Sequence, residues 1–217
     1  MAVYPKVLLV EGKNEIFVIA ELIEKNGVVW KINDKQTVVH IKGNKGDREL
    51  VDADKITTAL QSSGLSILGI IIDADDNLLG RWKSIRNASR QSIPDIPEDL
   101  PENGLIHTTS EGIKFGIWIM PDNKTEGMLE TFLAYLISPE EEELWQLAQT
   151  ATQEARNRDA PFKKTHRDKA NIYTWLAWQD PPGLQLHQAV MKKRILNPTH
   201  PNAQKFVNWF KTLYDLT

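Results

Sequence analysis

The chain has 217 residues, an apolar fraction of 41%, a charged fraction of 25% and a formal net charge of -3, which are ordinary values for a globular protein. The slightly negative charge argues against a protein that coats nucleic acid through a global basic field, although an enzyme with a local basic patch stays open. The absence of cysteine excludes disulfides, thiolate catalysis and zinc sites with cysteine ligands. Residues 1–6 lack a signal-peptide pattern and no apolar run is long enough to span a membrane, so we expect a cytoplasmic protein without membrane contact.

The first part of the chain alternates between strand and helix patterns. Apolar runs predict strands at residues 7–10, 37–41, 65–72 and 114–120, with a short edge strand at 105–108. Apolar residues at helical spacing predict helices through residues 16–23, 50–60, 78–90 and 127–136. This order predicts an α/β fold with a mainly parallel four-stranded sheet flanked by helices and right-handed crossovers.

The chain changes character at Ser138. Ser138, Pro139 and four glutamates form a helix start, so we interpret the acidic run as a solvated first turn and not as a metal site. We predict an α/β domain over residues 1–137 and a helical extension over 138–217 that packs on it.

Further helices are expected within this extension. They cover residues 138–158, 171–178, 184–195 and 202–216, with a basic connector at 161–169. In the last helix Phe206, Trp209, Phe210 and Leu213 form an apolar face, which we interpret as core and not as a groove for a partner.

The stretch from Leu65 to Asp76 is the most informative in the chain. Its unbroken apolar run, with three consecutive isoleucines, is typical of a strand buried on both faces. The run stops at Asp73, and Asp73 and Asp75 point the same way in an extended chain. Two neighbouring carboxylates repel each other, and a divalent cation relieves that repulsion. The alternative is that residues 73–76 only form a turn and cap the next helix.

Several carboxylates follow strands in this pattern. Parallel strands place all their carboxyl ends along one edge of the sheet, where open α/β folds hold ligands. Glu11, Asp73, Asp75 and Asp122 would therefore lie along the same edge although they are far apart in sequence. Such convergence weakens the interpretation of a simple turn and cap.

Two common nucleotide motifs are absent. The loop at residues 43–46 lacks the Gly-Lys-Ser/Thr ending of a P-loop, and no Gly-x-Gly-x-x-Gly follows the first strand. These absences argue against a nucleoside triphosphate site and against a dinucleotide, although a Rossmann-like small-molecule binder remains a hypothesis.

Two motifs carry a family resemblance. Val10-Glu-Gly-Lys13 on the first strand and Ile72-Asp-Ala-Asp75 on the third resemble the Toprim domain over roughly residues 5–135. Type IA and type II topoisomerases, bacterial primases, small ribonucleases that mature ribosomal RNA and nucleases of the OLD (overcoming lysogenization defect) family share that domain, and the Glu-Gly-Lys form is closest to the last two. The chain also resembles a group of uncharacterised Toprim-like proteins in residues 118–130 and 174–179.

The resemblance implies roles for the first acidic residues. Glu11 matches the Toprim glutamate, a general acid/base or metal ligand, and Asp73 and Asp75 match its metal-binding aspartates. Their hard oxygen ligands suit Mg²⁺, or Mn²⁺ in its place.

OLD-like nucleases bind a second metal and use a later lysine to stabilise the transition state. The resemblance makes Asp122, Glu126 and Glu130 candidates for the second set, with Glu126 and Glu130 on one face of one helix. Lys169 is the candidate lysine and His166 a weaker helper. The alternatives are an ordinary first helical turn for the glutamates and a solvated basic connector for Lys169 and His166.

The remaining candidates are basic. Lys13 and Arg81, with Lys83 and Arg86 beside it, are expected to contact backbone phosphates, and the alternative is a solvated helix face.

We thus carry two main hypotheses. The first is a Mg²⁺-dependent nuclease or related phosphoryl-transfer enzyme acting on DNA or RNA; the second is a non-catalytic Toprim module that docks on a partner, such as a separate ATPase in a defence system. No tyrosine nucleophile or ATPase domain is recognisable, which argues against a topoisomerase and a complete OLD protein.

Overall fold

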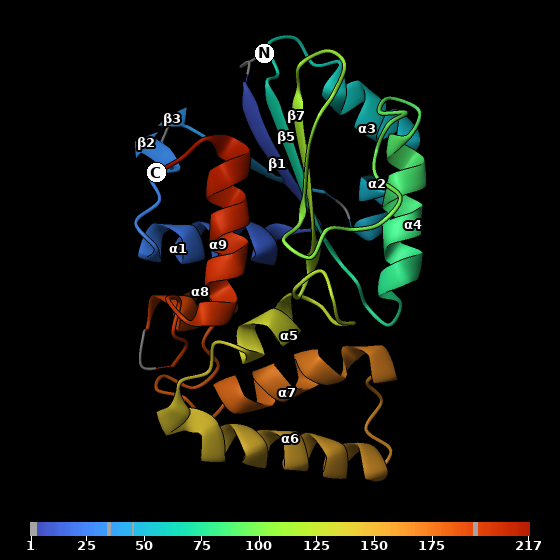
Figure 1. Cartoon of the computed structure of the whole chain (residues 1–217). Coiled ribbons are helices and arrows are strands. Elements are labelled where there is room, and N and C mark those ends of the chain that lie inside the picture. The colour runs from blue at the N-terminus through green and yellow to red at the C-terminus, as the bar shows by residue number, and fades with distance from the viewer. Residues whose placement is uncertain (1–3, 34–35, 45, 193–194) are drawn as a thin grey trace.

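A mostly parallel sheet forms the centre of the molecule (Figure 1). The computed structural model describes residues 4–33, 36–44, 46–192 and 195–217. Its strands are β1 (Lys6–Val10), β2 (Lys31–Asn33), β3 (Gln36–Thr37), β4 (His40–Gly43), β5 (Ile67–Asp73), β6 (Leu105–Thr108) and β7 (Lys114–Met120). Five of them form one sheet in the order β4-β1-β5-β7-β6, with β6 antiparallel at its edge. The predicted Rossmann-like α/β class is confirmed: the sheet has four parallel strands, and β6 adds a fifth.

Helices cover both faces of this sheet. They are α1 (Lys13–Lys25), α2 (Asp47–Leu50), α3 (Ala53–Leu60), α4 (Leu78–Ser89), α5 (Leu129–Ala134), α6 (Glu142–Asn157), α7 (Arg167–Leu176), α8 (Leu186–Met191) and α9 (Pro201–Tyr214), with short 3₁₀ helices η1 (Pro139–Glu141) and η2 (Lys164–His166). Figure 1 shows α1 and α9 on one face, α2 to α4 on the other, and α6 and α7 together beyond α5. Among the described residues, no helix is both long enough and apolar enough to cross a membrane.

Two predicted elements in the first part of the chain are each divided in the structure. The predicted strand at 37–41 is split, because β3 pairs with β2 in a separate two-stranded sheet and only β4 joins the central sheet. The predicted helix at 50–60 is split between α2 and α3. Asp52 accepts a hydrogen bond from Lys55 N at 3.1 Å and so starts α3 as an N-cap.

Two helix starts also differ from the prediction. Helix α5 begins at Leu129, since Gly127 has φ +140° and Met128 is extended, so Glu126 lies outside the helix. The prediction that Glu126 and Glu130 share one helix face is therefore wrong. Helix α7 begins at Arg167, four residues before the predicted start, so the end of the predicted basic connector is helical.

Two predictions fall partly outside the described residues. The segment without a signal-peptide pattern includes residues 1–3, and the predicted helix at 184–195 includes residues 193–194.

The C-terminal helix packs directly on the sheet. The four residues of its predicted apolar face are all buried, which confirms their interpretation as core. Gly69 on β5 lies against Tyr214 and Leu213, and Gly116 on β7 lies against Leu213, so a side chain on either glycine would collide with α9. The hydroxyl of Tyr214 donates to Val7 O at 2.8 Å, so the buried phenol is satisfied by the strand that it covers.

The predicted solvated helix start is confirmed for three of its four glutamates; Glu141 is half-buried and accepts a hydrogen bond from Gln179 Nε2 at 2.9 Å, and the Ser138 side chain does not cap the helix. Glu140, Glu142 and Glu143 are exposed at η1 and the first turn of α6. Acidic side chains at this end complement the positive end of the helix dipole.

Candidate functional site

The carboxyl ends of β1 and β5 bring two predicted residues into contact. Glu11 follows β1, and Asp73 is the last residue of β5. The two strands are parallel neighbours, so Glu11 and Asp73 meet at one edge of the sheet. The Asp73 backbone N–H donates to Glu11 Oε1 at 2.8 Å. This contact confirms the prediction that Glu11 and Asp73 lie together at the edge of the sheet.

Asp73 also connects the sheet to α5. Its Oδ1 accepts a hydrogen bond from Leu129 N, the first residue of that helix, at 3.0 Å. The cap of α4, by contrast, is Asn77, whose side chain accepts from Gly80 N at 2.8 Å. The alternative that residues 73–76 cap the next helix is thus wrong for α4, although Asp73 does cap the start of α5.

Asp75 adopts a left-handed backbone. Its φ is +53°, a conformation uncommon for residues other than glycine, asparagine and aspartate. A pair of backbone hydrogen bonds with Gly127, at 2.7 and 2.8 Å, holds it there. Its Oδ2 accepts from Arg81 at 2.6 Å, and Arg81 also contacts Asp47 Oδ2 at 2.8 Å. Arg81 therefore bridges two carboxylates, and the alternative of a solvated helix face does not hold for it; its predicted contact with phosphate stays a prediction.

Glu130 and Lys169 approach the same edge from α5 and α7. Glu130 is 4% exposed, and its Oε1 lies 3.3 Å from Lys169 Nζ. The lysine side chain is 48% exposed, so its ammonium group also faces solvent. Lys169 lies in α7 and not in a loose connector, and the structure places it beside one of the predicted acids.

Burial and mutual repulsion perturb these carboxyl groups. Burial raises the pKa of Glu11 to about 7, with Asp75 and Glu15 raising it and the Asp73 N–H and Arg81 lowering it. Burial, followed by the charges of Glu11 and Glu130, raises the pKa of Asp73 well above its usual range. Burial also raises the pKa of Glu130, against the lowering effect of Lys169. Burial is the largest cause of each rise, and a pKa of about 7 means that Glu11 is partly protonated near neutral pH.

The other predicted residues lie apart from these contacts. Asp122 Oδ1 accepts hydrogen bonds from Lys124 N at 3.0 Å and from Thr125 N at 2.9 Å, and so forms a local turn. Glu126 is exposed in the turn before α5, Lys13 is exposed at the first residue of α1, and His166 is exposed at the end of η2. None of these four contributes to the hydrogen bonds that join Glu11, Asp73 and Leu129.

The sequence analysis missed three residues near the acidic edge. Glu15 lies in the first turn of α1, and its charge raises the pKa of Glu11 and Asp73. Its spacing of four residues from Glu11, at a predicted strand-to-helix junction, could have identified it. Asp47 and Tyr173 come from α2 and α7, and no local pattern links them to the strand ends.

These carboxylates do not form a ready cage for an ion. Across residues 4–33, 36–44, 46–192 and 195–217, no group of three or more His, Cys, Asp or Glu side chains is arranged to enclose a metal. The donor set that the geometry does offer is made of carboxylate oxygens. Glu11 Oε2 and Asp73 Oδ2 accept no hydrogen bond from the described residues, which use only Oε1 and Oδ1.

Comparison with known proteins gives a family but no activity. A family model described as a protein of unknown function (DUF3226) matches residues 5–215. No curated protein and no solved structure matches the chain. The match spans both the central sheet and the helices that follow it.

Proposed function

We propose, from the premise that the chain belongs to the DUF3226 family, that it is a Toprim-like, Mg²⁺-dependent phosphodiesterase acting on nucleic acid at the acidic edge of the sheet. One observation carries the proposal. Glu11, Asp73 and Glu130 come from three separate elements, yet the pKa of each is raised by burial and by other carboxylates nearby. Grouped acids whose charge is not fully neutralised are characteristic of functional sites.

The donor set supports a magnesium ion that keeps most of its water. Mg²⁺ in proteins is usually bound by one or two carboxylates together with several waters, so it does not need a cage of three side chains. Asp73 Oδ2 is the oxygen that would hold it, and Asp75, paired with Arg81, lies near enough to raise the pKa of Asp73. When bound, the ion would supply Lewis-acid polarisation of a phosphoryl oxygen.

Glu11 is suited to move the proton in phosphodiester hydrolysis. A pKa of about 7 places it near the value at which a general base is most effective at neutral pH. It would accept a proton from the water that attacks phosphorus, and the bond from phosphorus to the leaving oxygen would break as that oxygen takes a proton from solvent. The hydrogen bond from the Asp73 backbone holds Oε1, so Oε2 is the atom that exchanges the proton.

Cationic groups around the edge would neutralise phosphate charge. An ammonium group has three donors, so Lys169 can contact Glu130 and still offer donors to a phosphate oxygen. Lys13 is exposed two residues after Glu11 and could contact a neighbouring phosphate, as could His166 before α7. Arg81 is already shared between Asp47 and Asp75, so its main effect is to position those carboxylates.

Metal titration calorimetry tests this proposal. We expect Mn²⁺ or Mg²⁺ to bind the wild-type chain, and Asp73→Asn to weaken binding at least about tenfold, because it removes a ligand charge and keeps the oxygen that caps Leu129. Asp76→Asn, an exposed aspartate three residues away, is the matched control and should bind like the wild type. Unchanged affinity in Asp73→Asn would remove the acidic edge as the metal site.

The same titration separates the proposal from the docking hypothesis. Binding by the wild type would be followed by cleavage assays on single-stranded and duplex DNA and RNA. No binding to the wild type, together with no cleavage, would favour a non-catalytic module that docks on a partner such as a separate ATPase.

A further inference from the structure

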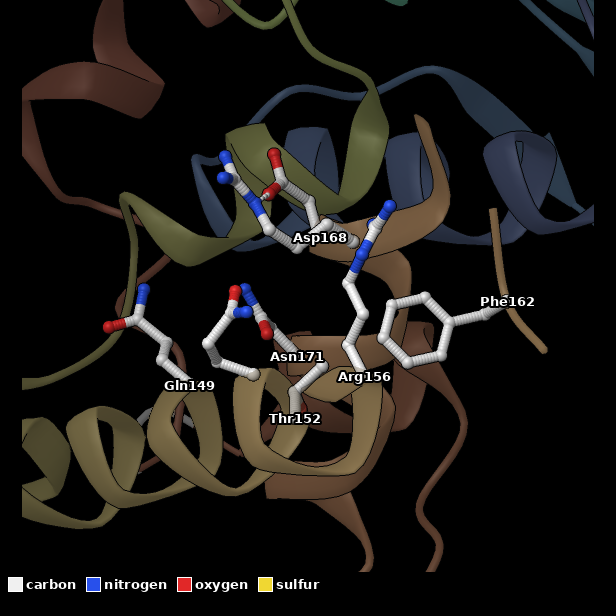
Figure 2. Close-up of a pocket in the computed structure, with 8 residues that line it drawn as sticks. Gln149, Thr152, Arg156, Phe162, Asp168 and Asn171 are labelled. Atoms are coloured by element: carbon white, nitrogen blue, oxygen red, sulfur yellow. Dashed lines mark ion pairs between the residues drawn. The ribbon is translucent and has the colours of Figure 1, made fainter. Parts of the chain in front are cut away.

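A second concave site lies between α6 and α7, outside the acidic edge. The cavity has a volume of about 350 Å³, at the lower end of the range of roughly 300 to 1,000 Å³ typical of small-molecule sites. Figure 2 shows Gln149, Thr152 and Arg156 of α6 and Asn171 of α7 around this space, with the ring of Phe162 at its side. Most of the lining is polar, so the cavity is built for a ligand that forms hydrogen bonds.

Asn171 is the strongest sign that a ligand belongs there. It is 6% exposed and lines the cavity, yet none of the described residues forms a hydrogen bond with its side-chain amide. The fully buried, unpaired side-chain atoms of the described residues do not include those of Asn171, so its amide is open to the cavity. The amide therefore offers a donor and an acceptor to a molecule that enters the cavity.

The charged residues of the lining favour an anion. Arg156 and Arg167 reach the cavity from α6 and α7, against one aspartate, Asp168. Asp168 already accepts a hydrogen bond from Thr131 Oγ1 at 2.6 Å, and its other oxygen lies 3.6 Å from Arg167 Nε. The Arg156 guanidinium lies 5.9 Å from the centre of the Phe162 ring, so a cation and an aromatic face stand together on one wall.

We propose that this cavity binds a nucleoside monophosphate unit. Arg156 and Arg167 contact the phosphate, and the planar base stacks on Phe162 or on the arginine plane. Amide side chains pair with base edges because they carry donor and acceptor together, a role open to Asn171 and Gln149. The unit comes either from a free mononucleotide or from the end of a single strand, and only the second source rests on the proposed function.

The cavity is directly connected to the acidic edge. Neighbouring residues of α5, Glu130 and Thr131, contact neighbouring residues of α7, Lys169 and Asp168. Glu130 and Lys169 belong to the edge, and Asp168 lines the cavity. A strand end held in the cavity would therefore sit against α7, the helix that carries Lys169 and is joined to α5 through Glu130 and Thr131.

Calorimetry with AMP, GMP, CMP and UMP on the full chain in EDTA tests the proposal without any metal. We expect the wild type to bind at least one of them and Arg156→Gln to weaken that binding about tenfold or more. Arg158→Gln is the matched control, because Arg158 lies on the same helix end but pairs with Glu154 and lies outside the cavity. Absence of binding to the wild type, or equal binding by Arg156→Gln, overturns the proposal.

Asn171→Leu provides a second and different signature. The leucine removes the amide from the cavity wall, so we expect nucleotide binding to be lost while the melting temperature of the unliganded chain changes by a few degrees at most. A variant that is destabilised and still binds nucleotide would show that Asn171 serves packing only.

Competition identifies the source of the nucleotide. If the mononucleotide displaces a labelled single-stranded oligonucleotide in EDTA, the cavity holds a strand end; if it does not, the ligand is a free mononucleotide. Asp73→Asn should bind nucleotide like the wild type. Failure of metal binding or cleavage and failure of this cavity are therefore separate results.

Discussion

Two regions of the central sheet, the face covered by α9 and the acidic edge at the carboxyl end of β5, differ in how their polar groups are accommodated. Where α9 crosses β5 and β7, Leu213 and Tyr214 are fully buried against glycines and the Tyr214 hydroxyl is bonded to Val7 O. At the carboxyl end of β5, Asp73 is grouped with Glu11 and Glu130, and the pKa of each is raised. The first region stabilises the fold, whereas the second keeps like charges together at a cost in stability.

The contrast between satisfied packing under α9 and clustered carboxyl groups at the edge indicates that the edge is the functional region. Close packing with satisfied polar atoms is what folding alone selects. Buried carboxyl groups that raise each other's pKa destabilise the folded state near neutral pH and need another reason to be present. The comparison predicts that substitutions in the two regions change stability in opposite directions.

The largest effect is expected at the α9 interface. Leu213→Ala should lower the free energy of unfolding by about 2–5 kcal/mol, because it leaves a cavity between α9 and the sheet. Leu147→Ala is the control, since Leu147 is 55% exposed on α6, and it should change stability by less than about 0.5 kcal/mol. Urea unfolding measures both; equal effects would remove the contrast between core and surface on which the comparison depends.

The acidic edge should show the opposite sign and a pH dependence. The pKa of Glu11 is raised from 4.5 to about 7, so between these values the folded chain holds a proton that the unfolded chain releases. Stability should therefore fall as pH rises through this window and level off above about pH 7.

Glu11→Gln removes this titration and keeps an oxygen for the Asp73 N–H. At pH 8 we expect it to stabilise the chain by up to about 3 kcal/mol and to flatten the decline between pH 4.5 and 7. Asp73 and Glu130 titrate in the same direction and leave a residual slope. Glu126→Gln, an exposed control, should follow the wild-type profile. If the unfolding free energy of Glu11→Gln declines with pH as steeply as that of the wild type, Glu11 is not one of the carboxyl groups that destabilise the acidic edge.

The smallest change in stability is expected at Lys169, whose loss should reduce catalysis more than folding. Lys169 is half exposed, and the buried Glu130, whose pKa is already raised, can take up a proton when the lysine is removed, so Lys169→Ala should alter the free energy of unfolding by about 1 kcal/mol or less. Cleavage of the nucleic acid found in the screen should nevertheless fall about tenfold or more, with metal affinity nearly unchanged. Wild-type turnover in this variant would leave Lys169 as a solvated lysine beside Glu130.

The site could be predicted from the sequence where a candidate residue directly follows a strand. Glu11 and Asp73 follow apolar runs, and parallel pairing brings such ends together whatever their separation in sequence. Glu126 was misplaced because Gly127 adopts φ +140°, a conformation that only the folded turn reveals and that delays the helix to Leu129. Asp47 was missed because its approach to Arg81 depends on how α2 and α4 pack.

The sequence by itself determined the α/β class, the parallel strands and the acidic ends of β1 and β5, because hydrophobic periodicity and strand polarity are local properties. Tertiary structure alone decided the rest. Only packing brings Lys169 to Glu130 and shares Arg81 between two carboxylates. Packing also buries Asn171 beside a cavity with no described partner for its amide. These contacts join helices far apart in the chain, and their geometry depends on crossing angles and side-chain fit that no short pattern specifies.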